Sequence, residues 1–475
     1  MKLYKLIFAS ALFFTAVISC DDFGDLNVDP NSATAVDPSN LVSYAQFIIY
    51  DRIHGRALNM EHGKLMVQHW SQNEYAEESR YQFDPAVANN AWFDFYTDVL
   101  KELEVAKELI EAQSIAENVK TNQKAIIDIL KVNAYMLLTD TFGDIPYSQA
   151  INNEFESPAY DAQEAVYSGM MSTLQSAATS IDPNAPSFSS GDIIYNGSIS
   201  HWKRFAHSLL LRMALRVSDA SPSLASQYAA VAASDLITSH ADEPRFIFDS
   251  APDRSNPMWR DKVLGSRDDF CISDVLVSVL NDLNDPRLAM FADPAPGNTQ
   301  IVGMPYGLDD NSASVLKSST SRPHADLLAN TAHHVIVSLS EVKFLLAEAY
   351  QRGILTGNAE TAYNEAVTAS MRYWGITDAA AIEGYLTANA YDEANWKASI
   401  GLQKWISLYT SGTEAWAEWR RLDQPVLTPS VNGVIPTIPV KLNYPQSEED
   451  SNGSNLGAVS SDPTSLIQKV WWDVN

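Results

Sequence analysis

The chain has 475 residues, and 59 acidic against 32 basic side chains give it a formal net charge of -27. Proteins that bind nucleic acid hold phosphates with clustered Lys and Arg, so this composition argues against that class. Hydrophobic residues make up 46% of the chain, which is enough for a core. Two cysteines cannot supply a disulfide framework or a Cys-rich metal site.

The N-terminus has the pattern of a lipoprotein secretion signal. A basic start precedes an apolar run over residues 6–18, and Val17-Ile18-Ser19-Cys20 resembles the bacterial lipobox, in which the cysteine is lipidated after cleavage. We predict a signal peptide over 1–19 and a lipid anchor at Cys20 within a tether over 20–40. A single folded domain is predicted over 41–475.

Apolar residues at helical spacing begin after the tether. They recur every three or four positions from Trp92 to Leu103, which predicts a helix over about 92–111. A second helix is predicted over 121–139, and the short link between the two indicates a hairpin. Two further helices, over 161–180 and 200–218, are expected to form another pair.

Another hairpin is predicted over 341–375, where Ser338 and Glu341 form a capping box at the start of its first helix. Its length is close to the period of about 34 residues in tetratricopeptide repeats. A last pair is predicted over 396–421. The sequence therefore predicts a mostly α-helical chain of tetratricopeptide-like helical hairpins. Long irregular stretches interrupt it over 242–270, 291–332 and 425–475, and loops of this length are usually functional.

The sequence contains none of the common enzyme motifs. A nucleophile elbow, a phosphate-binding loop, a dinucleotide-binding loop and a zinc-protease helix are all absent from it. His62 and His69 show no chelating arrangement, so we expect each to be exposed or hydrogen-bonded. Cys271 lies in an apolar context and is predicted to be buried and unreactive. The acidic stretches 281–285 and 309–311 offer oxygen ligands for calcium but match no calcium loop, so no metal or cofactor is predicted.

Aromatic residues make up 10% of the chain, and several fall outside the predicted helices. A flat ring stacks on the apolar face of a sugar, while neighbouring polar side chains hydrogen-bond to its hydroxyls. From composition and loop placement, the predicted ligand-binding residues are Trp70, Tyr75, Trp259, Arg260 and Tyr306.

Several motifs read in order resemble the SusD/RagB family of outer-membrane nutrient-binding lipoproteins, in its SusD-like branch from Bacteroidetes. The resemblance covers nearly the whole chain after Cys20. Two positions depart from the family pattern, Ser198 and Lys441. The motifs that carry the resemblance include Asp25-Leu26-Asn27, Phe142-Gly143-Asp144-Ile145-Pro146-Tyr147, Trp202-Lys203-Arg204-Phe205-Ala206, Asn284-Asp285-Pro286-Arg287-Leu288, Glu341-Val342-Lys343-Phe344-Leu345 and Ile438-Pro439-Val440-Lys441-Leu442.

This resemblance implies a right-handed helical body in which tetratricopeptide-like hairpins form the scaffold and long loops packed on one side form the ligand face. It implies a protein that is not an enzyme and that is anchored by lipid at the cell-surface side of the outer membrane. Such a protein captures oligosaccharides and delivers them to a SusC-like TonB-dependent transporter, which the repeats would face.

Three alternatives stay open at this point. The ligand could be a peptide or another small nutrient, or the chain could cap a transporter as a scaffold without a ligand of its own. A surface glycoside hydrolase would need a pair of carboxyl groups at the separations used for glycosidic cleavage.

Overall fold

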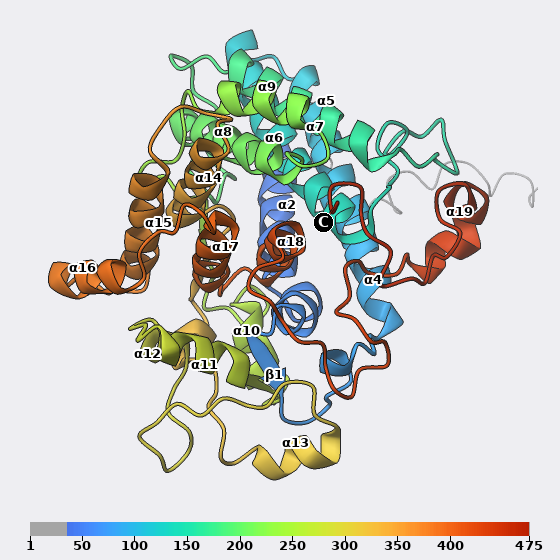
Figure 1. The fold of residues 1–475 in the computed structure, drawn as a ribbon. Coiled ribbons are helices and arrows are strands. Elements are labelled where there is room, and N and C mark those ends of the chain that lie inside the picture. Colours follow the sequence, from blue (N-terminus) through green and yellow to red (C-terminus); the bar gives the residue numbers. More distant parts are fainter. Residues whose placement is uncertain (1–35, 475) are drawn as a thin grey trace, which may run out of the picture. The chain divides into compact units, whose positions relative to one another are not determined.

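The structure is a computed structural model that describes residues 36–474 of the chain (Figure 1). Contacts within the chain divide it into residues 1–37 and 38–475. Cys20, the predicted signal peptide and most of the predicted tether lie outside the described residues, so these assignments stay predictions. The first described helix, α2 (Pro38–Ile53), begins inside the stretch predicted as the tether.

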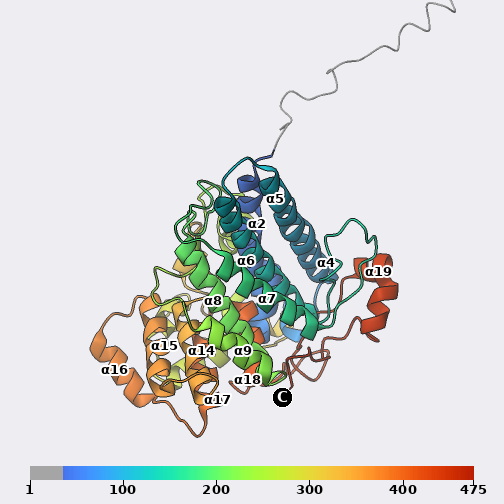
Figure 2. The same ribbon diagram turned by 90° about the horizontal axis from the view of Figure 1, so that it is seen from above.

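Helices that follow one another in the chain pack together, as Figures 1 and 2 show. Helix α6 packs against α7, α7 against α8 and α8 against α9, while α14 packs against both α15 and α17. A contact between α8 and α14 joins the two groups. The predicted, mostly α-helical fold is therefore confirmed. These helices are α6 (Glu117–Phe142), α7 (Gln163–Ser180), α8 (Ile199–Arg216), α9 (Pro222–Ala232), α14 (Leu339–Gln351), α15 (Ala359–Tyr373) and α17 (Trp396–Ser407).

The helix predicted over 92–111 exists but is interrupted. Helix α4 (Pro85–Phe93) passes into a π-helical segment, η4 (Asp94–Lys101), and then into α5 (Glu102–Ala112). The Asp84 carboxylate accepts a hydrogen bond from the backbone N–H of Ala86, which caps α4. The apolar face from Trp92 to Leu103 is buried against the core, so the predicted face is right although the turns are wider than expected.

The irregular stretches contain short elements that the sequence did not reveal. Strand β1 (Trp70–Gln72) pairs antiparallel with β3 (Phe270–Ile272), and β2 (Arg245–Ile247) pairs with β4 (His333–Val335). Three residues are too few to show alternation. The short helical segments are η2 (Arg56–Gly63), α3 (Lys64–Met66), η3 (Glu78–Arg80), α10 (Pro257–Trp259), η5 (Arg260–Leu264), α11 (Asp274–Asp282), α12 (Leu288–Phe291), α13 (Asp310–Leu316) and η6 (Ala325–Leu328).

The C-terminal stretch, expected to be irregular, contains the helix α19 (Gln446–Val459). Only Asn452 and Leu456 of this helix are buried, so no apolar stripe could reveal it in the sequence. The remaining helices are α16 (Ala379–Ala388) and α18 (Gly412–Leu422). Among the described residues, no helix combines the length and the hydropathy that crossing a membrane requires.

Two predictions about single residues had different outcomes. Cys271 is fully buried, as predicted, and burial raises the pKa of its thiol, which favours the unreactive thiol form. His62 is also buried, and neither of its ring nitrogens has a hydrogen-bond partner among the described residues, so its predicted environment was wrong. Its ring packs edge-on against Trp416 with 4.4 Å between centroids, and burial lowers its pKa to about 3. Such a ring stays neutral and acts as part of the core.

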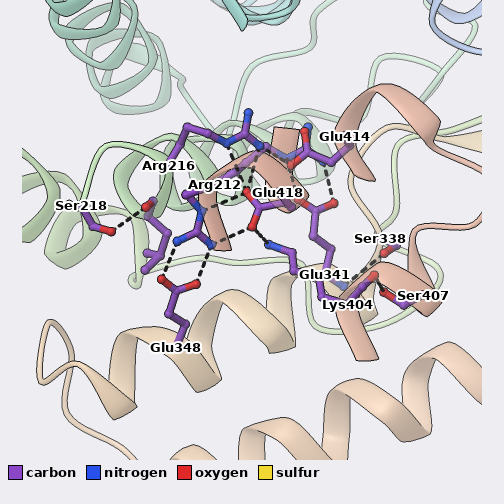
Figure 3. A network of polar contacts seen from close by, with 12 residues as sticks. Arg212, Arg216, Ser218, Ser338, Glu341, Glu348, Lys404, Ser407, Glu414 and Glu418 are labelled. Carbon is purple, nitrogen blue, oxygen red and sulfur yellow. Dashed lines mark hydrogen bonds and ion pairs between the residues drawn. The ribbon is translucent and has the colours of Figure 1, made fainter. Parts of the chain in front are cut away.

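A buried network of charged side chains joins α6, α8, α14, α17 and α18 (Figure 3). Arg216 of α8 is fully buried and forms ion pairs with Asp140 of α6 and with Glu414 and Glu418 of α18. One turn earlier on α8, the Arg212 Nε atom lies 2.6 Å from the Glu341 carboxylate of α14. These contacts tie helices from distant parts of the chain to one another.

A second branch of the network runs through the carboxylate of Glu418. It accepts from Lys404 of α17 and from Arg421 of α18, each at 2.7 Å, and Arg421 also holds Glu348 of α14 at 2.6 Å. Burial favours protonation of Glu418, but its cationic neighbours outweigh this and lower its pKa. Burial raises the pKa of Glu414 to about 7 against the pull of Arg212 and Arg216. Four cations of this network thus share five carboxylates, and each charged group depends on several others for its partners.

Removing one cation should leave buried carboxylates of this network without a partner. In Arg216→Met, three carboxylates lose their shared partner inside the core, and we expect the free energy of unfolding to fall by about 3–5 kcal/mol. Urea denaturation followed by circular dichroism measures the change. Lys124→Met is the control, because Lys124 pairs with Glu111 at the surface and should leave the midpoint unchanged. Equal midpoints for the two variants would show that the network is not the scaffold's main constraint.

A candidate ligand-binding cavity

A cavity of about 560 Å³ opens between α2, η2, the junction of α4 with η4, and the junction of α10 with η5. Cavities of this size hold small-molecule ligands in other proteins. We call it the arginine cavity. Its lining consists of Asp51, Arg52, Gly55, Arg56, Ala57, Leu58, Asn90, Ala91, Asp94, Pro257, Arg260 and Asp261.

The local sequence explains how Arg260 is placed at the arginine cavity, which Trp259 and Tyr75 do not line. The Asn256 side chain accepts a hydrogen bond from the backbone N–H of Met258, and Pro257 occupies the first helical position. This pairing of an Asn cap with Pro starts a helical turn. Trp259 ends that turn in a partly buried position, and Arg260 opens η5 and lines the cavity.

Every guanidinium of the arginine cavity is held by a carboxylate. Arg52 pairs with both Asp51 and Asp94, and Arg260 also pairs with Asp51. Arg56 pairs with Asp261 at 2.7 Å. The walls therefore present fixed donors and acceptors side by side, without an unpaired arginine.

A second layer of charge holds Arg56 in place. Its guanidinium also contacts Glu61 at 2.5 Å and Asp269 at 2.7 Å. Burial alone would lower the pKa of Arg56, but these carboxylates raise it overall. Burial raises the pKa of Asp261, and Arg56 opposes that shift. Arg56 is thus a permanently charged centre around which the carboxylates are arranged.

Tyr75, at the surface, contacts this group of charged residues through Arg267. The guanidinium of Arg267 lies 4.2 Å from the centroid of its ring, and Arg267 pairs with Asp269 at 2.6 Å. The backbone of Tyr75 adopts a left-handed conformation with φ of 51°, and Gln72 donates a hydrogen bond to its carbonyl at 2.7 Å. A residue other than glycine in this conformation needs such support. The ring is 55% exposed and available for stacking.

Trp70 and Tyr306, also predicted to bind ligand, lie elsewhere. Trp70 is only 1% exposed, and its indole donates to the Tyr409 hydroxyl at 2.9 Å, so in this structure it is a core residue in strand β1 and not a loop residue. Tyr306 is partly buried, and burial together with Tyr81 raises the pKa of its hydroxyl. Neither residue lines the arginine cavity. Burial leaves Trp70 no face for a ligand.

Several residues of the cavity were missed by the sequence analysis. Arg56 and Asp261 are 205 residues apart in the chain, and only the fold brings them together. Tyr44 on α2 is exposed and interacts electrostatically with Arg52, but it does not line the cavity. The only sequence pattern that could have pointed to these residues is the close spacing of Arg52, Gly55 and Arg56. This pattern does not indicate which carboxylates the two arginines pair with.

The stretches considered for calcium use their oxygens for other contacts. Asp285 holds the buried Arg287 at 2.5 Å, and Asp309 caps α13 by accepting from the backbone N–H of Ser312. Within residues 36–474, no group of three or more His, Cys, Asp or Glu side chains is arranged to hold a metal ion.

Comparison with known proteins decides the family. A family described as SusD-like, starch-binding and associating with the outer membrane, matches residues 30–445. The chain belongs to the SusD-like family. No protein of curated function matches it.

Solved structures of SusD-like proteins share the fold. A chitin-binding protein is 28% identical to this SusD-like chain with a TM-score of 0.81, and the match covers 92% of this chain and 100% of that one. A chitin-binding SusD homologue from Flavobacterium johnsoniae is 22% identical with a TM-score of 0.80 and coverages of 92% and 99%. A SusD homologue from Bacteroides uniformis is 23% identical with a TM-score of 0.78 and the same coverages.

Substitutions at Trp70 and Tyr75 should differ in their effect on stability. Trp70→Ala removes a buried side chain and is expected to lower the free energy of unfolding by about 3–5 kcal/mol. Tyr75→Ala should change it by less than about 0.5 kcal/mol, because the ring is exposed. Thermal or urea unfolding of both variants gives the comparison. A stable Trp70→Ala variant would return Trp70 to the candidate ligand residues.

Proposed function

We propose that this SusD-like protein captures an oligosaccharide at the arginine cavity. The main evidence for this proposal is the cavity itself, whose size suits a ligand and whose walls are lined by ordered polar groups. Its family is described as starch-binding, and a relative that is 28% identical is described as chitin-binding. A glycan is therefore the ligand class that we assign to the site.

The chemistry of the walls suits a neutral glycan. Guanidinium groups donate to sugar hydroxyls and the paired carboxylates accept from them, while Tyr75 offers a ring face beside the cavity's charged layer. An anionic sugar would compete with carboxylates that already hold Arg52, Arg56 and Arg260. We propose that Trp259, next to Arg260 in the chain, contributes a second aromatic contact. Tyr306 lies away from this cavity, and we leave it out of the proposed site.

The proposed function is binding without catalysis. A glycoside hydrolase needs one carboxyl group that is free to donate a proton and a second that acts as a base or nucleophile. The cavity carboxylates of Asp51, Asp94 and Asp261 are each committed to an arginine. This pairing favours a role in ligand recognition.

We further propose that the captured glycan is delivered to a SusC-like TonB-dependent transporter at the outer-membrane surface, with Cys20 as the lipid anchor. The motif Val17-Ile18-Ser19-Cys20 and the family's association with the outer membrane support this anchor. Cells fed labelled palmitate should incorporate it into the wild-type chain but not into Cys20→Ser. Equal labelling of both proteins, or none of either, would contradict the anchor.

Binding of chitohexaose and maltohexaose to the purified protein, measured by calorimetry, tests the capture role. We expect one of them to bind, and Arg260→Ala and Tyr75→Ala each to weaken binding by about tenfold, which corresponds to about 1.4 kcal/mol. Phe155→Ala, which removes an exposed ring elsewhere, is the matched control and should bind like the wild type.

Three outcomes would contradict the proposal. Equal loss in Phe155→Ala would mean that the cavity is not the site. Release of shorter sugars during the titration would contradict the absence of catalysis. Failure of both hexasaccharides to bind would contradict glycan capture as proposed.

A further inference from the structure

A second cavity, of about 480 Å³, lies along α14 and α15 and shares no residue with the arginine cavity. Thr361, Asn364, Thr368 and Arg372 of α15 line it at intervals of three or four residues, so they form one stripe along the helix. At about 1.5 Å per residue, the stripe is roughly 16 Å long. We call this elongated cavity the α15 groove.

Arg372, at one end of the α15 groove, has an unusual environment for this chain. It is exposed, and no ion pair or hydrogen bond involves its guanidinium among residues 36–474. Every other arginine in the described residues that is not fully buried forms an ion pair, Arg254 and Arg352 among them. In a chain with a net charge of -27, a cation without a carboxylate is available for an external anion.

Helix α15 does not neutralise the charge of Arg372. Arg372 lies in the last turn of α15, where a cation interacts favourably with the helix dipole. That interaction leaves the guanidinium donors free. The carboxylate of the groove, Glu365, is held by Lys343 at 2.6 Å, so it does not neutralise Arg372.

The remaining lining indicates which kind of anion fits. No Trp, Tyr or Phe lines the α15 groove, so it lacks the ring faces on which sugars stack. The hydroxyls of Thr361 and Thr368 and the amide of Asn364 can instead donate to and accept from a peptide backbone. At about 3.3 Å per residue, an extended peptide of about five residues matches the length of the stripe.

We propose that the α15 groove binds an extended acidic segment of a partner protein, with a carboxylate of that segment paired to Arg372. This site is separate from the proposed glycan site and does not depend on it. The overall negative charge of the chain repels acidic peptides in general. Binding of one would therefore point to a specific local site.

Fluorescence anisotropy with fluorescein-labelled pentaglutamate tests the proposal on the purified protein, with pentaglutamine as the neutral comparison. We expect pentaglutamate to bind at least about tenfold more tightly than pentaglutamine. Arg372→Glu should abolish this difference. Arg254→Glu, which changes an exposed arginine that does not line the groove, should preserve it.

Absent or equal binding of the two peptides would overturn the proposal, as would an unchanged difference in Arg372→Glu. Unlabelled trigalacturonate, an acidic glycan, is added as a competitor. Displacement of pentaglutamate by trigalacturonate at equal concentration would overturn the assignment to a peptide. The melting temperature of Arg372→Glu is compared with that of the wild type. Equal melting temperatures show that a loss of binding comes from the substituted side chain and not from unfolding.

Discussion

The rest of the structure depends on the buried ionic network around Arg216. Charges removed from water are costly unless they are paired, so Asp140, Glu414 and Glu418 must all reach this one guanidinium. That requirement fixes α6, α8 and α18 at one place, and the branch through Glu418 adds α14 and α17. A packed apolar interface tolerates small shifts, whereas a network of this kind is satisfied only in one arrangement of the helices.

The arginine cavity inherits its geometry from this arrangement. Helix α18, held by the network, packs closely against η2: a side chain at Gly63 would lie 2.3 Å from the backbone of Gly412. Asn59 of η2 accepts a hydrogen bond from the Gly412 N–H at 2.8 Å. The segment η2 also carries Arg56, whose guanidinium organises Glu61, Asp261 and Asp269. A chain of direct contacts thus links the scaffold to the wall of the cavity.

The long helices could be predicted from the sequence because each buries a continuous apolar face, as from Trp92 to Leu103. Strands of three residues and the helix α19, which buries only Asn452 and Leu456, have no such pattern and were missed. The cavity was only partly foreseen. Of the five predicted ligand residues, only Arg260 lines it. Trp70 was predicted to be a loop aromatic but lies in the core, because whether an indole is buried depends on distant partners such as Tyr409. The pairing of Arg56 with Asp261 across 205 residues has no local signal at all.

A crystal structure of the purified protein with a bound oligosaccharide that calorimetry has shown to bind is the most direct test of the central claim. We expect sugar density in the arginine cavity, with hydroxyls hydrogen-bonded to Arg260 and Asp261 and a ring stacked on Tyr75. Density at another surface, with the ion pairs of Arg52, Arg56 and Arg260 unchanged and the cavity empty of sugar, would contradict the claim that this cavity captures the ligand.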